Sequence, residues 1–62
     1  MKTYTYKVGR YEFNVNCTPN SDGIFVCHIP AYDLIFGARN KETIEKKAIA
    51  MVTVWMDFYN VK

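Results

Sequence analysis

The sequence is poor in the residues that form covalent cross-links and metal sites. Its 62 residues include two cysteines and one histidine. Two cysteines cannot build the disulfide framework that stabilises many small secreted domains. Cys17, Cys27 and His28 also lack the spacing of a zinc site, and a fourth ligand is missing. We therefore expect no metal and no cofactor, and we expect both thiols to be free and buried in a reducing cytoplasm.

Long apolar runs and an excess of one charge are also absent. The longest apolar stretch, AIAMVTVW, is interrupted by Thr53 and is far shorter than the about 18 residues of a membrane span. No signal peptide is recognisable, so we expect a cytoplasmic protein without membrane contact. The net charge is only +2, whereas dedicated nucleic-acid binders usually carry a concentrated basic surface. Lysine and glutamate are interleaved from Lys41 to Lys47, which is typical of a solvated helix face.

The residues of acid–base and nucleophilic catalysis are present but not grouped. His28 follows Cys27 in an expected strand, where neighbouring side chains point to opposite faces, so the two cannot form a base–nucleophile pair. The carboxylates do not converge as a two-metal site requires. They are Glu12, Asp22, Asp33, Glu42, Glu45 and Asp57. There is no glycine-rich phosphate loop either, and we expect this protein not to be an enzyme.

Apolar side chains are what the sequence has in abundance, since half of its residues are hydrophobic. A chain this short buries only about 60% of its unfolded surface and forms a single domain, here residues 1–62. One such domain cannot hide all of these side chains. We therefore expect a homodimer, a surface for a protein partner, or both.

The order of periodic segments predicts the fold. TYTYKV and YEFNVNCT alternate polar and apolar residues on either side of a turn at Gly9-Arg10. Asp22-Gly23 signals a hairpin, IFVCHI returns as a strand that ends at Pro30, and LIFGA is a further short strand. We expect an α+β fold in which an antiparallel sheet of three to four strands (β-β-β-β-α or β-β-β-α order) packs on one C-terminal helix.

A hairpin register that pairs Val15 with Cys27 would place Cys17 and Cys27 diagonally, which disfavours a disulfide. The opposite face of this hairpin carries Ile24, Val26 and His28. These three residues are candidates for contact with a partner. The alternative is that β-branched residues simply suit a strand.

The helix is expected to begin after an N-cap at Asn40 and to lay a broad apolar stripe on the sheet. The predicted stripe comprises Ile44, Ala48, Met51, Val52, Trp55, Phe58 and Tyr59. The predicted core comprises Phe13, Val15, Phe25, Ile29, Ile44, Ala48, Met51, Trp55 and Phe58. Because this arc is wider than one sheet face needs, we expect a dimer contact through the helix flank of Ile49, Val52 and Met56. The alternative is that these are scattered surface residues.

A second candidate partner surface is the tyrosine-rich first strand. Tyr4 and Tyr6 stand among basic residues, and exposed aromatic rings on a sheet can stack on bases. A single-stranded nucleic-acid binder is therefore an alternative function. The same tyrosines would equally cover the core or a dimer edge.

The segment from Tyr11 to Tyr59 resembles the HicB-type antitoxin domain, a partial ribonuclease-H-like fold. The resemblance rests on the Asp22-Gly23 turn, the strand IFVCHI, the short strand after Pro30, and a helix with Ile44 and Ala48 at core positions. Two features depart from the family pattern. Ala38-Arg39 stand where members usually carry a glycine, and Asn40 replaces the usual threonine cap. The resemblance is to a short version that lacks the C-terminal DNA-binding module.

The resemblance implies a protein-binding domain that keeps a nuclease-like fold without nuclease residues. Antitoxins of this family cover a small toxin that cleaves messenger RNA. We therefore expect a module that acts by occluding a protein partner. The alternative within this class is a phage or mobile-element protein that inhibits a host defence protein by binding it.

Overall fold

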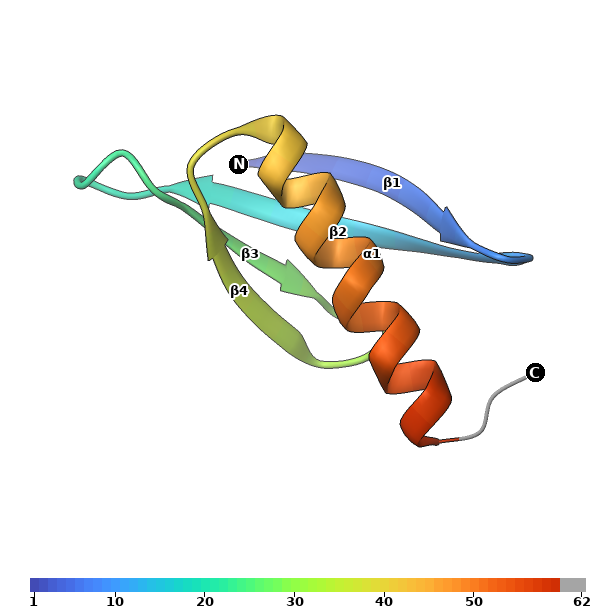
Figure 1. Cartoon of the computed structure of the whole chain (residues 1–62). Coiled ribbons are helices and arrows are strands. Elements are labelled where there is room, and N and C mark those ends of the chain that lie inside the picture. Colours follow the sequence, from blue (N-terminus) through green and yellow to red (C-terminus); the bar gives the residue numbers. More distant parts are fainter. Residues whose placement is uncertain (60–62) are drawn as a thin grey trace.

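The protein is an antiparallel sheet with one helix packed across one of its faces (Figure 1). The structure is a computed structural model and describes residues 1–59. The strands are β1 (Lys2–Val8), β2 (Tyr11–Pro19), β3 (Phe25–Ile29) and β4 (Leu34–Ala38), followed by α1 (Lys41–Phe58). They lie side by side in chain order, and each is antiparallel to the next. The predicted α+β fold is confirmed, with β-β-β-β-α order.

Two turns hold the first three strands together. Gly9 connects β1 to β2 with a φ of 61°, a left-handed conformation that suits glycine. The β2–β3 loop is organised by Asn20, whose side-chain oxygen accepts hydrogen bonds from the backbone N–H groups of Asp22 (2.9 Å) and Ile24 (3.1 Å). The Asn20 N–H also donates to the Ile24 carbonyl at 2.9 Å. These bonds fix a loop that runs from Asn20 to Ile24.

The register between β2 and β3 differs from the predicted one by two residues. Cys17 lies directly opposite Cys27, and Asn16 lies opposite His28. The predicted pairing of Val15 with Cys27, and with it the diagonal placement of the two cysteines, is wrong. The cause is the Asn20 loop, which shifts the hairpin centre toward the C-terminus. Both cysteines are buried, and both thiols are free.

The core lies between the sheet and α1. It consists of Phe13, Val15, Cys17, Cys27, Ile29, Ala38, Ile44, Ala48, Val52 and Met56. Alternate residues of β2 and β3 supply the sheet side, as period-two patterning requires. Of the predicted core, Phe25, Met51 and Trp55 are only partly buried, and the prediction for Phe58 is wrong, because this residue is 79% exposed.

The helix is rotated about its axis relative to the predicted orientation. Ile44, Ala48, Val52 and Met56 are spaced four residues apart and form the line that faces the sheet. Phe58 and Tyr59 therefore turn toward solvent. The N-cap prediction is confirmed, since the Asn40 side chain accepts a hydrogen bond from the Thr43 N–H at 2.8 Å.

Candidate functional site

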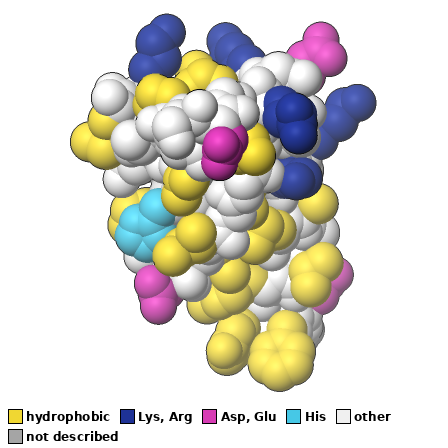
Figure 2. Space-filling model, turned by 90° about the vertical axis from the view of Figure 1, so that its left-hand side faces the viewer, with side chains coloured by type: hydrophobic (Ala, Val, Ile, Leu, Met, Phe, Trp, Pro, Cys, Tyr) yellow, Lys and Arg dark blue, Asp and Glu magenta, His cyan; other side chains and the backbone are white. Residues whose placement is uncertain are grey.

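Within residues 1–59, two apolar surfaces are not covered by the described strands and helix. The first is the outer sheet face, the side of the sheet opposite α1. The second is the helix groove, which lies between β4 and the C-terminal half of α1. Figure 2 shows hydrophobic side chains gathered in the lower half of that view, whereas lysine and arginine side chains gather near the top.

One half of the outer sheet face is polar and satisfied within the chain. On β1 and β2, the Thr3 hydroxyl donates to the Asn16 side-chain oxygen at 2.9 Å, and the Thr5 hydroxyl donates to that of Asn14 at 2.9 Å. These pairs lie directly across the two strands. Since the side-chain oxygens already accept these bonds, this half is an ordinary solvated surface.

The other half of the outer sheet face is apolar. Val26 on β3 is 45% exposed, and Ile35 on the edge strand β4 is 66% exposed. Ile35 lies opposite His28, and Val26 lies opposite Gly37. Ile24 is packed close to Gly37: a Cβ atom at that glycine would lie 3.4 Å from the Ile24 Cγ2 atom. Ile24, Val26, His28 and Ile35 thus form one uncovered patch, of which the sequence had indicated the first three.

His28 marks the border of this patch. Its Nε2 atom lies 3.6 Å from the Asp33 carboxylate. The backbone of Asp33 has a φ of 55°, in the left-handed region that aspartate tolerates better than most residues. The pair is largely exposed, with 43% of the His28 side chain and 96% of the Asp33 side chain accessible. Such an exposed pair contributes little to stability, so His28 is available for hydrogen bonding to a partner.

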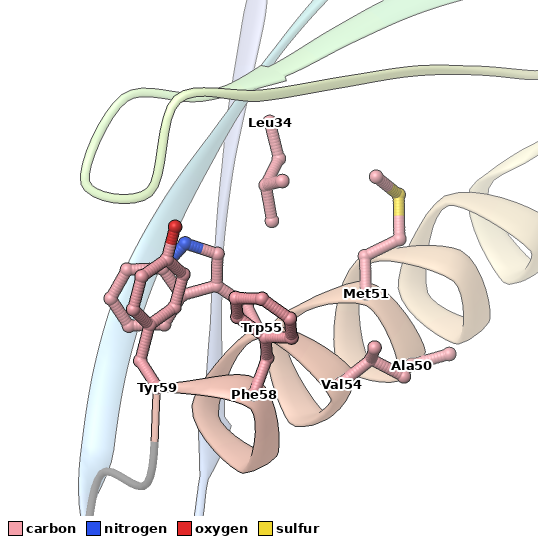
Figure 3. Close-up of a pocket in the computed structure, with 7 residues that line it drawn as sticks. All are labelled: Leu34, Ala50, Met51, Val54, Trp55, Phe58 and Tyr59. Carbon is pink, nitrogen blue, oxygen red and sulfur yellow. The ribbon is translucent and has the colours of Figure 1, made fainter.

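The helix groove is an open hollow of about 420 Å³. Leu34 points from the start of β4 toward α1, and the remaining lining residues belong to the helix and its end (Figure 3). They are Ala50, Met51, Val54, Trp55, Phe58 and Tyr59. Val54 is 66% exposed and Phe58 is 79% exposed. Periodicity showed that α1 is apolar on more than one side, but it could not show that this flank is the open one.

The predicted dimer flank of Ile49, Val52 and Met56 is wrong for two of its three residues. Val52 is fully buried and Met56 is 7% exposed, because both lie on the face of α1 that packs against the sheet. Only Ile49 is partly buried at the margin of the core. The excess apolar surface of the helix lies on its opposite flank, in the helix groove.

The predicted tyrosine surface faces the helix side and not solvent. Tyr4 and Tyr6 are partly buried against the core, and their ring centroids lie 6.2 Å apart. The Lys41 ammonium lies over the Tyr4 ring at 5.4 Å. The Tyr6 hydroxyl is buried and has no hydrogen-bond partner among residues 1–59, and loss of hydration, together with the nearby Glu45 carboxylate, raises its pKa. Both rings are thus already in contact within the chain.

Tyr32 is a structural residue that the sequence did not single out. It lies in the β3–β4 loop, where its ring centroid is 6.2 Å from that of Phe13 and 4.5 Å from that of Trp55. The ring centroid of Trp55 in turn lies 4.6 Å from that of Tyr59. This contact series supports the wall of the helix groove. Loop aromatic residues carry no periodic signal, and only the fold reveals this role.

Within residues 1–59, no group of three or more histidine, cysteine, aspartate or glutamate side chains could hold a metal ion. No helix in the same range is long and apolar enough to cross a membrane. In comparisons with protein-family models, curated proteins and solved structures, nothing matched this chain.

Proposed function

We propose that this chain is a non-enzymatic module that binds a protein partner through the apolar half of the outer sheet face. The observation that carries the proposal is this uncovered patch. Among residues 1–59, Val26 and Ile35 remain 45% and 66% exposed. Clustered apolar side chains bordered by polar groups are typical of protein-binding surfaces.

The mode of action that we propose is occlusion. The patch offers apolar contact and one imidazole, a combination suited to covering a partner surface. In the HicB-type antitoxins that this chain resembles, the covered surface belongs to a small toxin that cleaves messenger RNA. A toxin of that kind is our proposed partner. Inhibition of a host defence protein by a phage or mobile-element protein is the alternative with the same physical basis.

A single-stranded nucleic-acid binder is the second alternative. It depended on exposed tyrosines, and the packing of Tyr4 and Tyr6 against the core favours the protein-binding proposal over it. The near-balance of charges, with net charge +2, argues in the same direction.

The test is affinity capture from a bacterial lysate in buffer of high ionic strength, compared between two matched variants. Ile35→Glu and Val54→Glu both place a carboxylate at a position that is 66% exposed, the first on the outer sheet face and the second in the helix groove. We expect one stoichiometric protein with the unmodified chain and with Val54→Glu, and its loss with Ile35→Glu. Retention by Ile35→Glu, or recovery of nucleic acid that salt removes, would contradict the proposal.

A further inference from the structure

We propose that the helix groove is a self-association surface, and that its occupant is the α1 helix of a second copy packed antiparallel. This proposal does not depend on the proposed function, because the outer sheet face lies on the other side of the sheet. A dimer formed through α1 would leave both outer sheet faces exposed and directed away from each other.

The exposed residues of the groove have the geometry of a helix-packing ridge. Ala50, Val54 and Phe58 are each four residues apart, so they lie in one row along α1. Rows of this kind pack into the groove beside the equivalent row of a facing helix. Ala50 is small and permits a close approach of the two backbones. Val54 and Phe58 supply the apolar surface that the contact buries.

The charges that border this row select a second copy in antiparallel orientation. Lys46 lies before the row and Asp57 lies near its end, and both are exposed. With about 3.6 residues per turn, these two residues are about three turns apart on nearly the same side of the helix. A two-fold axis between Ala50 and Val54 therefore brings Lys46 of each copy near Asp57 of the other. A parallel pair would instead leave Lys46 of one copy about three turns away from Asp57 of the other along the helix axis.

The same arrangement covers Phe58. In the antiparallel pair, Lys46 of the second copy lies across from Phe58, where its aliphatic stem can cover the ring while its ammonium group reaches Asp57. Each contact occurs twice, as a two-fold interface requires. A second copy presents matching charged and apolar residues by symmetry, whereas an unrelated partner would have to present the same arrangement by chance.

A stable dimer through the helix groove would bury a substantial fraction of the surface of this chain. Stable interfaces bury about 600–1,000 Å² on each partner, which is about a seventh to a quarter of the 4410 Å² surface of this chain. In the helix groove Val54 and Phe58 are 66% and 79% exposed, and their side chains supply the apolar surface that such an interface would bury. Burial here would also add to a core that is small for an independent domain.

The first test is the mass of the protein in solution as a function of concentration, measured by sedimentation. We expect the unmodified chain to approach twice its 7.2 kDa mass as the concentration rises. Val54→Glu should remain monomeric with an unchanged circular dichroism spectrum, because the side chain is 66% exposed and supports no core contact. A monomer at all concentrations, or a dimer that Val54→Glu leaves intact, would overturn the proposal.

A charge exchange tests the orientation even if Val54→Glu perturbs folding. Lys46→Glu and Asp57→Lys should each weaken the dimer, by about threefold to tenfold, since each places like charges across the interface. The double variant restores opposite pairs and should recover the original dissociation constant. Lys7→Glu on β1 is the control for a charge change outside the interface. Failure of the double variant to recover dimerisation would exclude the antiparallel arrangement.

Discussion

The sharpest test of the helix orientation compares two valines that are two positions apart in α1. Val52 is fully buried against the sheet, whereas Val54 is 66% exposed in the helix groove. Val52→Ala and Val54→Ala remove the same two methyl groups from the same helix. Any difference between their effects therefore reports the environment and not the chemistry of the change.

The expected loss at Val52 follows from its burial. Transfer of two methyl groups accounts for about 1.6 kcal/mol, at about 0.8 kcal/mol for each group. The cavity left behind adds up to about 1 kcal/mol. Val52→Ala should thus lower the free energy of unfolding by about 2–3 kcal/mol. For a domain of this size that corresponds to a fall in Tm of about 10–20 °C.

Val54→Ala should change the free energy of unfolding by less than about 0.5 kcal/mol and can raise it slightly, because alanine has the higher helix propensity. The assay is urea and thermal unfolding followed by circular dichroism, at a dilution where both variants sediment as monomers. Equal losses in the two variants would refute the orientation of α1. A larger loss at Val54 would show that the helix presents its other side to the sheet.

Three further predictions follow from the core, the helix cap and the buried thiols. Met56→Glu should prevent folding, as judged by loss of the cooperative unfolding transition, because it buries a carboxylate in the core. Asn40→Ala should lower the free energy of unfolding by about 1 kcal/mol in urea titrations, and Asn40→Asp should not, because only alanine loses the bond to the Thr43 N–H. Burial, and to a lesser extent a hydrogen bond with Cys17, raises the pKa of Cys27 to about 12. In the unfolded chain this thiol loses its proton near pH 8.5. The free energy of unfolding should therefore fall as the pH rises from about 8.5 to 12, because only the unfolded chain is deprotonated in that range. The urea midpoint should fall less steeply with pH for Cys27→Ala than for the unmodified chain. An identical pH dependence in both proteins would contradict the attribution of this effect to Cys27.

The hairpin between β2 and β3 shows how a correct face can accompany a wrong register. The alternation of Phe13, Val15 and Cys17 identified the buried side of β2 from the sequence. A shift of two residues preserves that side, because side chains alternate with a period of two. Nothing in the alternation could therefore reveal that Cys17 lies opposite Cys27. The side chain of Asn20 decided it, through bonds that exist only in the folded loop.

The candidate surfaces were likewise only partly predictable from the sequence. Strand alternation placed Val26 and His28 on the outer sheet face, whereas Ile35 was identified only when β4 paired with β3. The groove residues Val54 and Phe58 were apolar in a helix that is apolar over a wide arc. Their exposure depended on how the helix is rotated on the sheet.

The sequence by itself determined the order of the elements, the buried sides of β2 and β3 and the N-cap of α1 at Asn40, and it left the number of strands at three to four. These properties depend on local periodicity and capping, which are written within short segments. Only the tertiary structure decided the strand register and the flank of α1 that stays open. Both depend on contacts between distant segments, where Ile44, Ala48, Val52 and Met56 fit against the sheet and leave Val54 and Phe58 outside.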